Sequence, residues 1–501
     1  MTPSRSRITG GGVLRVASYA AIILTSLVLL STLGSCMPFV EGARAPTASS
    51  ITHRVDAQAA ATPSPTPLGD LTDTSLLSSM LEAEPDETTA DSVSIGQDYY
   101  LDSTSGSDSN SGLSPDEAWQ TFQPLADQEL QPGDTVHFKT DSAWTGALFI
   151  DDHGSPEHPL TFTTYGSGNK PVFENPRGRS AITIRGDWVV VEGMKVRNVV
   201  EAGVTIAADH AIVQDMQVTD AGMGVAVRGQ HNIIRNNYIH DLKMVRNTPG
   251  GDDDYGAVGV WLFDSYNEVA GNLMVNCQAP SYDYGTDGGG VEIFGGDIHG
   301  SYIHHNWIID SDGGLEIGGG SARDHVIAYN VFINNSWAIV FHLGGRYASE
   351  VDNIRFENNV VIETQPDHRP LFNFFRGEPS EDTLSVTNNI FYVLEGAVAD
   401  HDAFRRQNNL YYLGEDALLG FQLASGELVA HPRFVDLDNH DFRLREGSPA
   451  IEAGVDLGYE MDFAGRPVPH GAAPDLGAFE FSPASLTEEA YKPTYPDLQL
   501  P

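Results

Sequence analysis

Short alternating runs of apolar residues recur along the chain from about residue 181 onward. Each run is followed by a turn, a second short apolar run, an Asn with an apolar residue two places later, and another turn. The starts of successive first runs lie 21, 35, 31, 24 and 24 residues apart. These first runs occupy residues 204–206, 225–227, 260–262, 291–293, 315–317 and 339–341. Such alternation predicts short strands, and repeats of this length predict a solenoid.

No helical pattern of any length separates these runs, which argues against units that join parallel strands through a helix. The spacing therefore predicts an all-β fold, a single-stranded right-handed parallel β-helix in which each coil contributes short strands to parallel sheets. Recurrent Asn residues support this prediction, because a buried amide needs partners and Asn stacked on Asn in successive coils supplies them. The Asn residues at the matching position are Asn237, Asn272, Asn306, Asn330, Asn359 and Asn389.

Several motifs in residues 98–481 resemble those of secreted right-handed parallel β-helix proteins related to pectate lyases. The stretch 99–103 with 106–112 is similar to the usual entry into such domains, and 131–136 resembles their first-coil motif. The stretches 441–444, 447–451 and 474–478 resemble a C-terminal module common on exported bacterial β-helix proteins. The resemblance implies the fold and leaves the reaction open, because lyases, glycosidases, epimerases and pure binders share it.

The first 35 residues have the pattern of a secretion signal. Arg5, Arg7 and Arg15 precede an apolar run over about residues 16–33. That run ends in Leu-Gly-Ser-Cys at residues 33–36, which resembles the bacterial lipoprotein signal, in which the Cys is lipidated. We therefore predict export and lipidation at Cys36, giving a cell-surface lipoprotein or an extracellular protein, with an ordinary cleaved signal or an uncleaved anchor as alternatives.

The remaining chain divides by composition. Residues 36–95, rich in Pro, Thr, Ala and acidic residues, predict a disordered tether. We expect the β-helix over 96–430, a C-terminal coil or cap module over 431–481, and a tail over 482–501. A short helix within 119–130 is expected to cap the first coil, and residues 434–481 to close the last, because a solenoid must cover its ends.

The net charge of the chain excludes one class of binding partner. The 501 residues include 28 Lys and Arg against 69 Asp and Glu, for a net charge of −41, and nucleic acid is excluded because binding its phosphates needs basic patches. Hydrophobic residues make up 41%, enough for a large core, and two Cys exclude a disulfide framework. We expect a monomer that acts on a polysaccharide and contacts a membrane only through its lipid anchor.

The two longest coils carry insertions, which solenoids place on a binding face. They cover about residues 243–256 and 278–287, in adjacent coils before the same strand, so we expect them side by side as one wall of a groove. Their aromatic and acidic residues suit a sugar, because rings pack on its apolar face and carboxylates accept from its hydroxyls. The sugar-platform candidates are Tyr255, Tyr282 and Tyr284, and the candidates for Ca²⁺ or sugar hydroxyls are Asp252, Asp253, Asp254 and Asp283. The alternative is a pair of solvated turns.

Two glutamates form the main catalytic candidate. Val291 and Ile293 are expected to point inward, so Glu292 points outward, and Glu316 holds the same position one coil later. Strands about 4.8 Å apart would stack the two carboxylates at roughly 5 Å on an exposed strand face. Repulsion between them should raise one pKa, and a general acid beside an ionised partner at about 5–5.5 Å fits retaining glycoside hydrolysis.

Neighbouring residues complete this hypothesis. Asp287 and Asp312 would orient the substrate or tune the pair, and Trp261 at the same register one coil earlier would stack on a sugar. Two further candidates for substrate binding are His342, two residues past the matching position one coil later, and Arg228, which points outward two places past Ala226 on an earlier strand. Flanking glycines at 288–290 and 313–314 would let a ligand approach the backbone. The hydrolase needs no cofactor.

Three other interpretations stay open. The glutamates could share a Ca²⁺ with Asp287 or Asp312, or form a solvated strip with no role. A Ca²⁺-dependent lyase acting on uronates would use a basic residue such as Arg228, Lys243 or Arg246 as its base. A non-catalytic glycan binder would keep the aromatics without needing stacked carboxylates.

Overall fold

A computed structural model describes residues 96–483, with the exception of residues 367 and 368. The predicted signal, Cys36, the tether and most of the tail therefore lie outside the described residues. Within the described part, helix is limited to two short turns, η1 (Pro115–Glu117) and α2 (Gln123–Ala126), and strands dominate. No helix there has the length and apolar character needed to span a bilayer.

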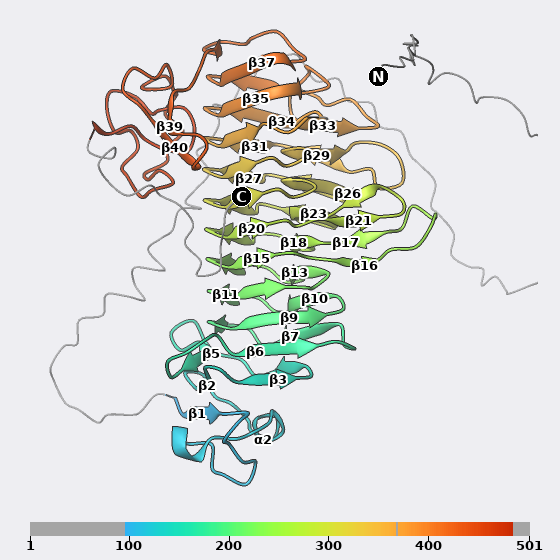
Figure 1. The fold of residues 1–501 in the computed structure, drawn as a ribbon, viewed down its shortest axis with the longest axis vertical. Helices are drawn as coiled ribbons and strands as arrows, with labels where there is room; N and C mark the ends of the chain where they lie inside the picture. Colours follow the sequence, from blue (N-terminus) through green and yellow to red (C-terminus); the bar gives the residue numbers. More distant parts are fainter. Residues whose placement is uncertain (1–95, 367–368, 484–501) are drawn as a thin grey trace, which may run out of the picture. The chain divides into compact units, whose positions relative to one another are not determined.

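Three long parallel sheets run through the domain, and successive coils add one strand to each (Figure 1). Because parallel crossovers are right-handed in nearly all proteins, the result is the right-handed parallel β-helix predicted from the repeats. Sheet A comprises β1 (Asp98–Leu101), β2 (Thr135–Lys139), β5 (Leu160–Tyr165), β8 (Val189–Glu192), β11 (Ile212–Gln214), β14 (Ile233–Arg235), β19 (Glu268–Ala270), β24 (Tyr302–His304), β27 (Val326–Ala328), β31 (Ile354–Glu357), β34 (Leu384–Thr387) and β36 (Arg405–Gln407).

The other two sheets follow the same order. Sheet B comprises β3 (Ala143–Thr145), β6 (Val172–Asn175), β9 (Lys195–Val199), β12 (Gln217–Thr219), β15 (Tyr238–His240), β20 (Leu273–Val275), β25 (Trp307–Ile309), β28 (Val331–Ile333), β32 (Val360–Glu363), β35 (Ile390–Ala397), β37 (Leu410–Leu418) and β38 (Leu428–Val429). Sheet C comprises β4 (Leu148–Ile150), β7 (Ser180–Ile184), β10 (Ala202–Ile206), β13 (Met223–Val227), β18 (Val258–Leu262), β23 (Gly289–His299), β26 (Leu315–Arg323), β29 (Ile339–His342) and β33 (Phe372–Phe375), with β30 (Glu350–Asp352) beside β26.

The predicted Asn positions form a continuous ladder of buried amides. Asn306 shows the pattern, since its Nδ2 donates to Asn330 Oδ1 at 3.0 Å while its own Oδ1 accepts from Asn272 Nδ2 at 3.0 Å. The ladder continues past Asn389 to Asn409 and ends at Glu427, whose Oε1 accepts from Asn409 Nδ2. Each amide thereby satisfies the next, as the repeat predicted.

The N-terminal coil is covered by the segment around α2. Phe122 stacks on Phe173 at 5.9 Å and on Trp144 at 5.9 Å, two rings of the first coils. Leu125 and Leu130 are buried in the same core. The helix itself is a single turn.

The C-terminal module lies elsewhere than predicted. The module packs on the outer face of sheet B and forms a second core there (Figure 1). It contains a hairpin of β39 (Phe434–Asp436) and β40 (Asp441–Leu444). Trp307 and Val331, from the outer face of that sheet, belong to this core. Closure of the last coil by residues 434–481 is therefore wrong in position. Phe421 packs on Tyr411 in the last coil, so the link between β37 and β38 reaches that end instead.

Candidate functional site

The register of sheet C places the two predicted glutamates side by side. Glu292 on β23 pairs with Glu316 on β26, while Trp261 on β18 pairs with Glu292 from the other side. Val291 and Ile293 are buried in the helix interior, so Glu292 points outward as expected. The stacked pair predicted from the alternation is confirmed as geometry, with strands about 4.8 Å apart.

The expected exposure of the pair is wrong. Glu292 is only 6% exposed, and the Glu316 side chain is 18% exposed. A segment after β29 packs beside the strand that carries Glu292. Tyr347 packs on Phe294 at 5.5 Å, and its hydroxyl donates to the carbonyl of Asp252 at 3.0 Å. The segment thus links sheet C to the first insertion, a contact that the sequence did not indicate.

Asp287 and Asp312 belong to the same electrostatic cluster. Burial, and then the charges of Glu316 and Asp312, raise the pKa of Asp287 to about 8. Burial also raises the pKa of Asp312, although a hydrogen bond from Thr286 at 2.5 Å opposes that shift. We call Asp287, Glu292, Asp312 and Glu316 the carboxylate cluster.

Glu292 also resists ionisation. Burial raises the pKa of its carboxyl well above the ordinary value, and the negative charges of Glu316 and Asp287 add to that effect. Its partner Glu316 instead has a specific neighbour, since His342 Nε2 lies 2.7 Å from Glu316 Oε1. The environments of the two stacked carboxyls therefore differ, which is the arrangement that acid and nucleophile roles need.

The two insertions form adjacent hairpins, as predicted. The first contains β16 (Met244–Arg246) and β17 (Tyr255–Gly256), and the second contains β21 (Ala279–Ser281) and β22 (Gly285–Asp287). Asn247 Nδ2 donates to the carbonyl of Pro280 at 2.8 Å, which joins their edges. The second hairpin carries Asp287 into the carboxylate cluster.

The predicted aromatic platform is only partly assembled. Tyr255 meets Trp261 edge to face at 6.1 Å, and Trp261 stacks on Phe263 at 4.9 Å. Tyr282 instead points into solvent with 68% exposure, and the Tyr284 hydroxyl is held by Asp252 Oδ1 at 2.9 Å. Tyr255 and Trp261 are thus the two platform candidates that the structure brings together.

Three of the four predicted Ca²⁺ ligands gather in one place. Oxygens of Asp253, Asp254 and Asp283 lie within 4.8 Å of one another, while Asp252 is occupied by Tyr284. Hydrogen bonds already use these carboxylates, because Asp254 Oδ2 accepts from Ser281 and the backbone N–H of Asp283, and Asp253 pairs with Arg246. These hydrogen bonds explain the cluster as a contact that holds the two hairpins together.

The predicted role of the flanking glycines is wrong for Gly290 and Gly314. A Cβ on Gly290 would lie 2.7 Å from Ile308 Cγ2, and one on Gly314 would lie 2.8 Å from Phe332 Cδ1. Both neighbours are core side chains. Gly290 and Gly314 therefore make room for packing inside the helix and leave no space for a ligand.

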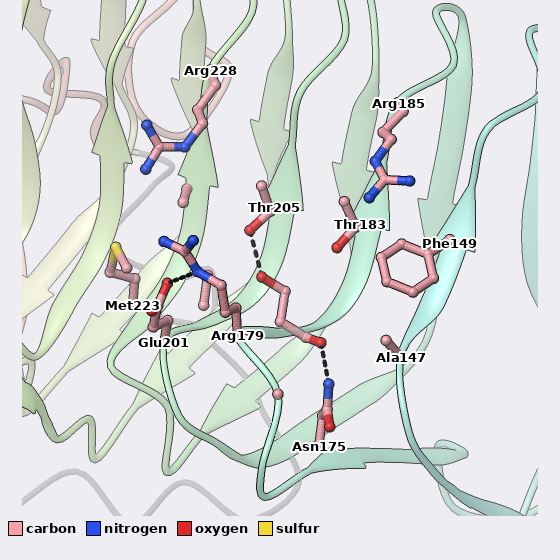
Figure 2. Close-up of a pocket in the computed structure, with 14 residues that line it drawn as sticks. Ala147, Phe149, Asn175, Arg179, Thr183, Arg185, Glu201, Thr205, Met223 and Arg228 are labelled. Atoms are coloured by element: carbon pink, nitrogen blue, oxygen red, sulfur yellow. Dashed lines mark hydrogen bonds and ion pairs between the residues drawn. The ribbon is translucent and has the colours of Figure 1, made fainter.

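A groove of about 670 Å³ lies on the same face, in the coils that precede Trp261 (Figure 2). Its floor includes Thr183 and Thr205, which hold the same register as Ala226 and Trp261. Arg228 lines it, as a predicted substrate-binding residue, and Arg179 and Arg185 also line it. The sequence offered one signal for Arg185, which stands two places past the outward Thr183 as Arg228 stands past Ala226.

Comparisons with known proteins agree with the fold. A family model described as right-handed beta helix region matches residues 180–391. Lacto-N-biosidase of Bifidobacterium longum subsp. longum is 34% identical over 91 residues, which are 17% of this chain and only 6% of that protein. The alignment therefore spans a small part of this relative.

Two solved structures resemble the chain. Pectate lyase Pel9A gives a TM-score of 0.57 at 15% identity, covering 78% of this chain and 98% of that one. The GH136 lacto-N-biosidase from Eubacterium ramulus gives a TM-score of 0.40 at 14% identity, covering 67% and 68%. At such low identity the likeness to the lyase shows the fold alone, and the chain is a right-handed parallel β-helix.

Proposed function

We propose that the chain is a glycoside hydrolase that uses Glu292 as general acid and base and Glu316 as nucleophile. The observation that carries this proposal is the in-register pair with unlike environments, in which Glu292 is buried and Glu316 faces His342. A spacing near that of adjacent strands, about 5 Å, suits a retaining mechanism.

In the first step, Glu316 Oε attacks the anomeric carbon while protonated Glu292 gives its proton to the departing glycosidic oxygen. The glycosidic bond breaks, and a covalent glycosyl ester forms on Glu316. In the second step, the Glu292 carboxylate removes a proton from water as the water attacks the anomeric carbon. This step releases the sugar and restores both groups.

His342 would serve as a positioning residue in this scheme. Its Nε2 contact fixes the rotamer of Glu316. Trp261 adjoins Glu292 in register, so a sugar ring packed there would reach the pair. Because Glu292 is 6% exposed, the side chains around it would have to shift to admit a glycan.

The test is a digest of neutral and acidic polysaccharides by the full chain, with reducing ends and ultraviolet absorbance recorded with and without EDTA. We expect reducing ends without absorbance, retention of anomeric configuration by NMR, and survival in EDTA. Glu292→Gln should lower turnover by roughly 10²–10⁴-fold, and Glu316→Gln by at least as much. The matched control is Glu350→Gln, an exposed residue on β30, which also pairs with β26.

The second candidate is a lyase acting on uronates, and Arg228 favours it. This residue is exposed on the face of sheet C that carries the glutamates. A lyase would use Ca²⁺ to neutralise the substrate carboxylate, and Asp253, Asp254 and Asp283 offer oxygens for it. Unsaturated ends that appear in the digest and vanish with EDTA would overturn the hydrolase. Glycan binding with no product of either kind would indicate a non-catalytic binder.

A further inference from the structure

The groove beside Trp261 is positively charged, in contrast to the chain as a whole. Three arginines, Arg179, Arg185 and Arg228, line it together with a single carboxylate, Glu201. The complete chain carries 28 basic and 69 acidic residues. A concentration of guanidinium groups in one groove is therefore a local reversal of the field that the rest of the protein produces.

Aromatic rings fix two of these guanidinium groups. Arg228 lies over the ring of Phe263 at 3.9 Å, and Arg185 lies over Phe149 at 4.7 Å. Stacking occupies the flat face of a guanidinium and leaves its N–H edge available, which is the edge that binds oxyanions in pairs of hydrogen bonds.

The arginines differ in how they are neutralised. Arg179 pairs with Glu201 at 2.8 Å, and Arg185 pairs with Asp151 at 3.0 Å. Within residues 96–366 and 369–483, no carboxylate forms an ion pair with Arg228. A guanidinium that is stacked, exposed and without an acidic partner is the group best prepared to receive an external anion.

The rest of the groove suits a sugar. Ser180 and Thr205 face each other with hydroxyl oxygens 2.7 Å apart, and Met223 and Ala226 add an apolar surface. Figure 2 shows the three arginines arranged around Thr183 and Thr205. Hydroxyls and apolar atoms recognise the sugar body, while guanidinium groups recognise a negative substituent on it.

We propose that this groove is a subsite for an anionic sugar residue, one that carries a carboxylate or a sulfate group. The proposal rests on the proposed function in one respect, namely that the outer face of sheet C binds the glycan. Thr205 stands three coils before Glu292, roughly 14 Å away at the usual strand spacing. A substrate that fills both places is therefore an oligosaccharide, with its anionic unit some residues from the bond that is cleaved.

The test is equilibrium binding by calorimetry to two matched pairs of probes. Oligogalacturonate against its methyl ester examines carboxylate recognition, and dextran sulfate against dextran examines sulfate recognition. The full chain carries Glu292→Gln in every titration so that no probe is consumed. We expect one anionic probe to bind at least about tenfold more tightly than its neutral counterpart, since charge-assisted hydrogen bonds are the stronger class.

Variants then locate the effect. Arg228→Gln should remove about tenfold of affinity for the preferred anionic probe, and Arg228→Lys should retain part of it. The matched control is Arg197→Gln, an exposed arginine on β9 of sheet B that pairs with Glu174. It removes the same charge from another face and should leave binding unchanged. Ionic strength alone would not serve, because salt screens both the groove and the general repulsion by the acidic surface.

The outcomes separate the two proposals. Equal binding of charged and neutral probes, or equal losses in Arg228→Gln and Arg197→Gln, would overturn the anion subsite. Preference for an anionic probe that survives both Arg228→Gln and Arg179→Gln would also overturn it. Preferred binding lost in Arg228→Gln, with no hydrolysis by the wild-type chain, would refute the hydrolase and leave the anion subsite standing.

Discussion

Replacing Asp287 with Asn would separate the charge of the carboxylate cluster from its shape. Asn is nearly isosteric and keeps an oxygen for the N–H of Gly288, which donates to Asp287 Oδ1 at 3.0 Å. Burial and the charges of Glu316 and Asp312 raise the pKa of Asp287 from its ordinary 3.8 to about 8. The fold therefore opposes ionisation of this residue in the neutral range.

The raised pKa of Asp287 makes stability depend on pH in a definite direction. Between pH 4 and pH 8 the folded protein holds a proton that the unfolded chain has released, so the free energy of unfolding falls as pH rises. Each pKa unit corresponds to about 1.36 kcal/mol, which sets a ceiling of roughly 5–6 kcal/mol over the window. Local relaxation and water entry reduce this penalty, and we expect Asp287→Asn to recover about 2–3 kcal/mol at pH 8.

The assay is urea unfolding followed by circular dichroism at pH 4 and at pH 8, with the shift in midpoint compared between wild type and Asp287→Asn. We expect the two proteins to differ by less than about 1 kcal/mol at pH 4, where the unfolded carboxyl, with its ordinary pKa of 3.8, is only partly ionised, and the variant to be more stable than wild type at pH 8. The exposed Asp416→Asn is the control and should show no difference at either pH. A variant no more stable than wild type at pH 8, or an advantage equal at both pH values, would refute the reasoning.

Three further predictions concern other parts of the chain. His342→Gln should lower kcat by roughly 10- to 100-fold with little change in KM, because it removes the contact that orients Glu316, and steady-state kinetics measures both constants. Asn306→Ala should lower the free energy of unfolding by about 2–4 kcal/mol, because it leaves buried amides of the ladder without partners, while exposed Asn439→Ala in the same denaturation assay should not. Cys36→Ser should move the full chain from the detergent phase to the aqueous phase in a phase-partition assay, and an unchanged distribution would contradict lipidation.

The repeat made the fold and the glutamate pair predictable from sequence. Alternation determines which side chains face the core, and a constant register then carries Glu292 and Glu316 to neighbouring strands. The same logic placed the two insertions side by side. Such inferences succeed because they depend on local spacing, which parallel coils translate directly into distance.

Features that depend on the path of a loop were not predictable in this way. The Tyr347 segment returns to the carbonyl of Asp252, about one hundred positions earlier in sequence, and nothing in the repeat indicates that contact. The position of the C-terminal module was also not predictable from the repeat. It depends on apolar side chains that fit its core, and these lie on the side of the helix and not at its end. Tyr238, Trp307 and Val331 on the outer face of sheet B are among these side chains. The surroundings of Gly290 and Gly314 were not predictable because the side chains beside them, Ile308 and Phe332, come from sheet B.

One outward position on sheet C carries the glutamate pair, Trp261 and the floor of the arginine groove. The residues that share this register are Phe149, Thr183, Thr205, Ala226, Trp261, Glu292, Glu316, Val340 and Asn373. The column passes from the hydroxyls of the arginine groove to an aromatic ring and then to the carboxylates. Inward neighbours maintain the core and the Asn ladder maintains the turn, so chemistry can change at this position without disturbing either. A glycan lying along the column would contact the groove first and the paired glutamates next, which would account for arginines that stand two to four coils before Glu292 in a strongly acidic protein.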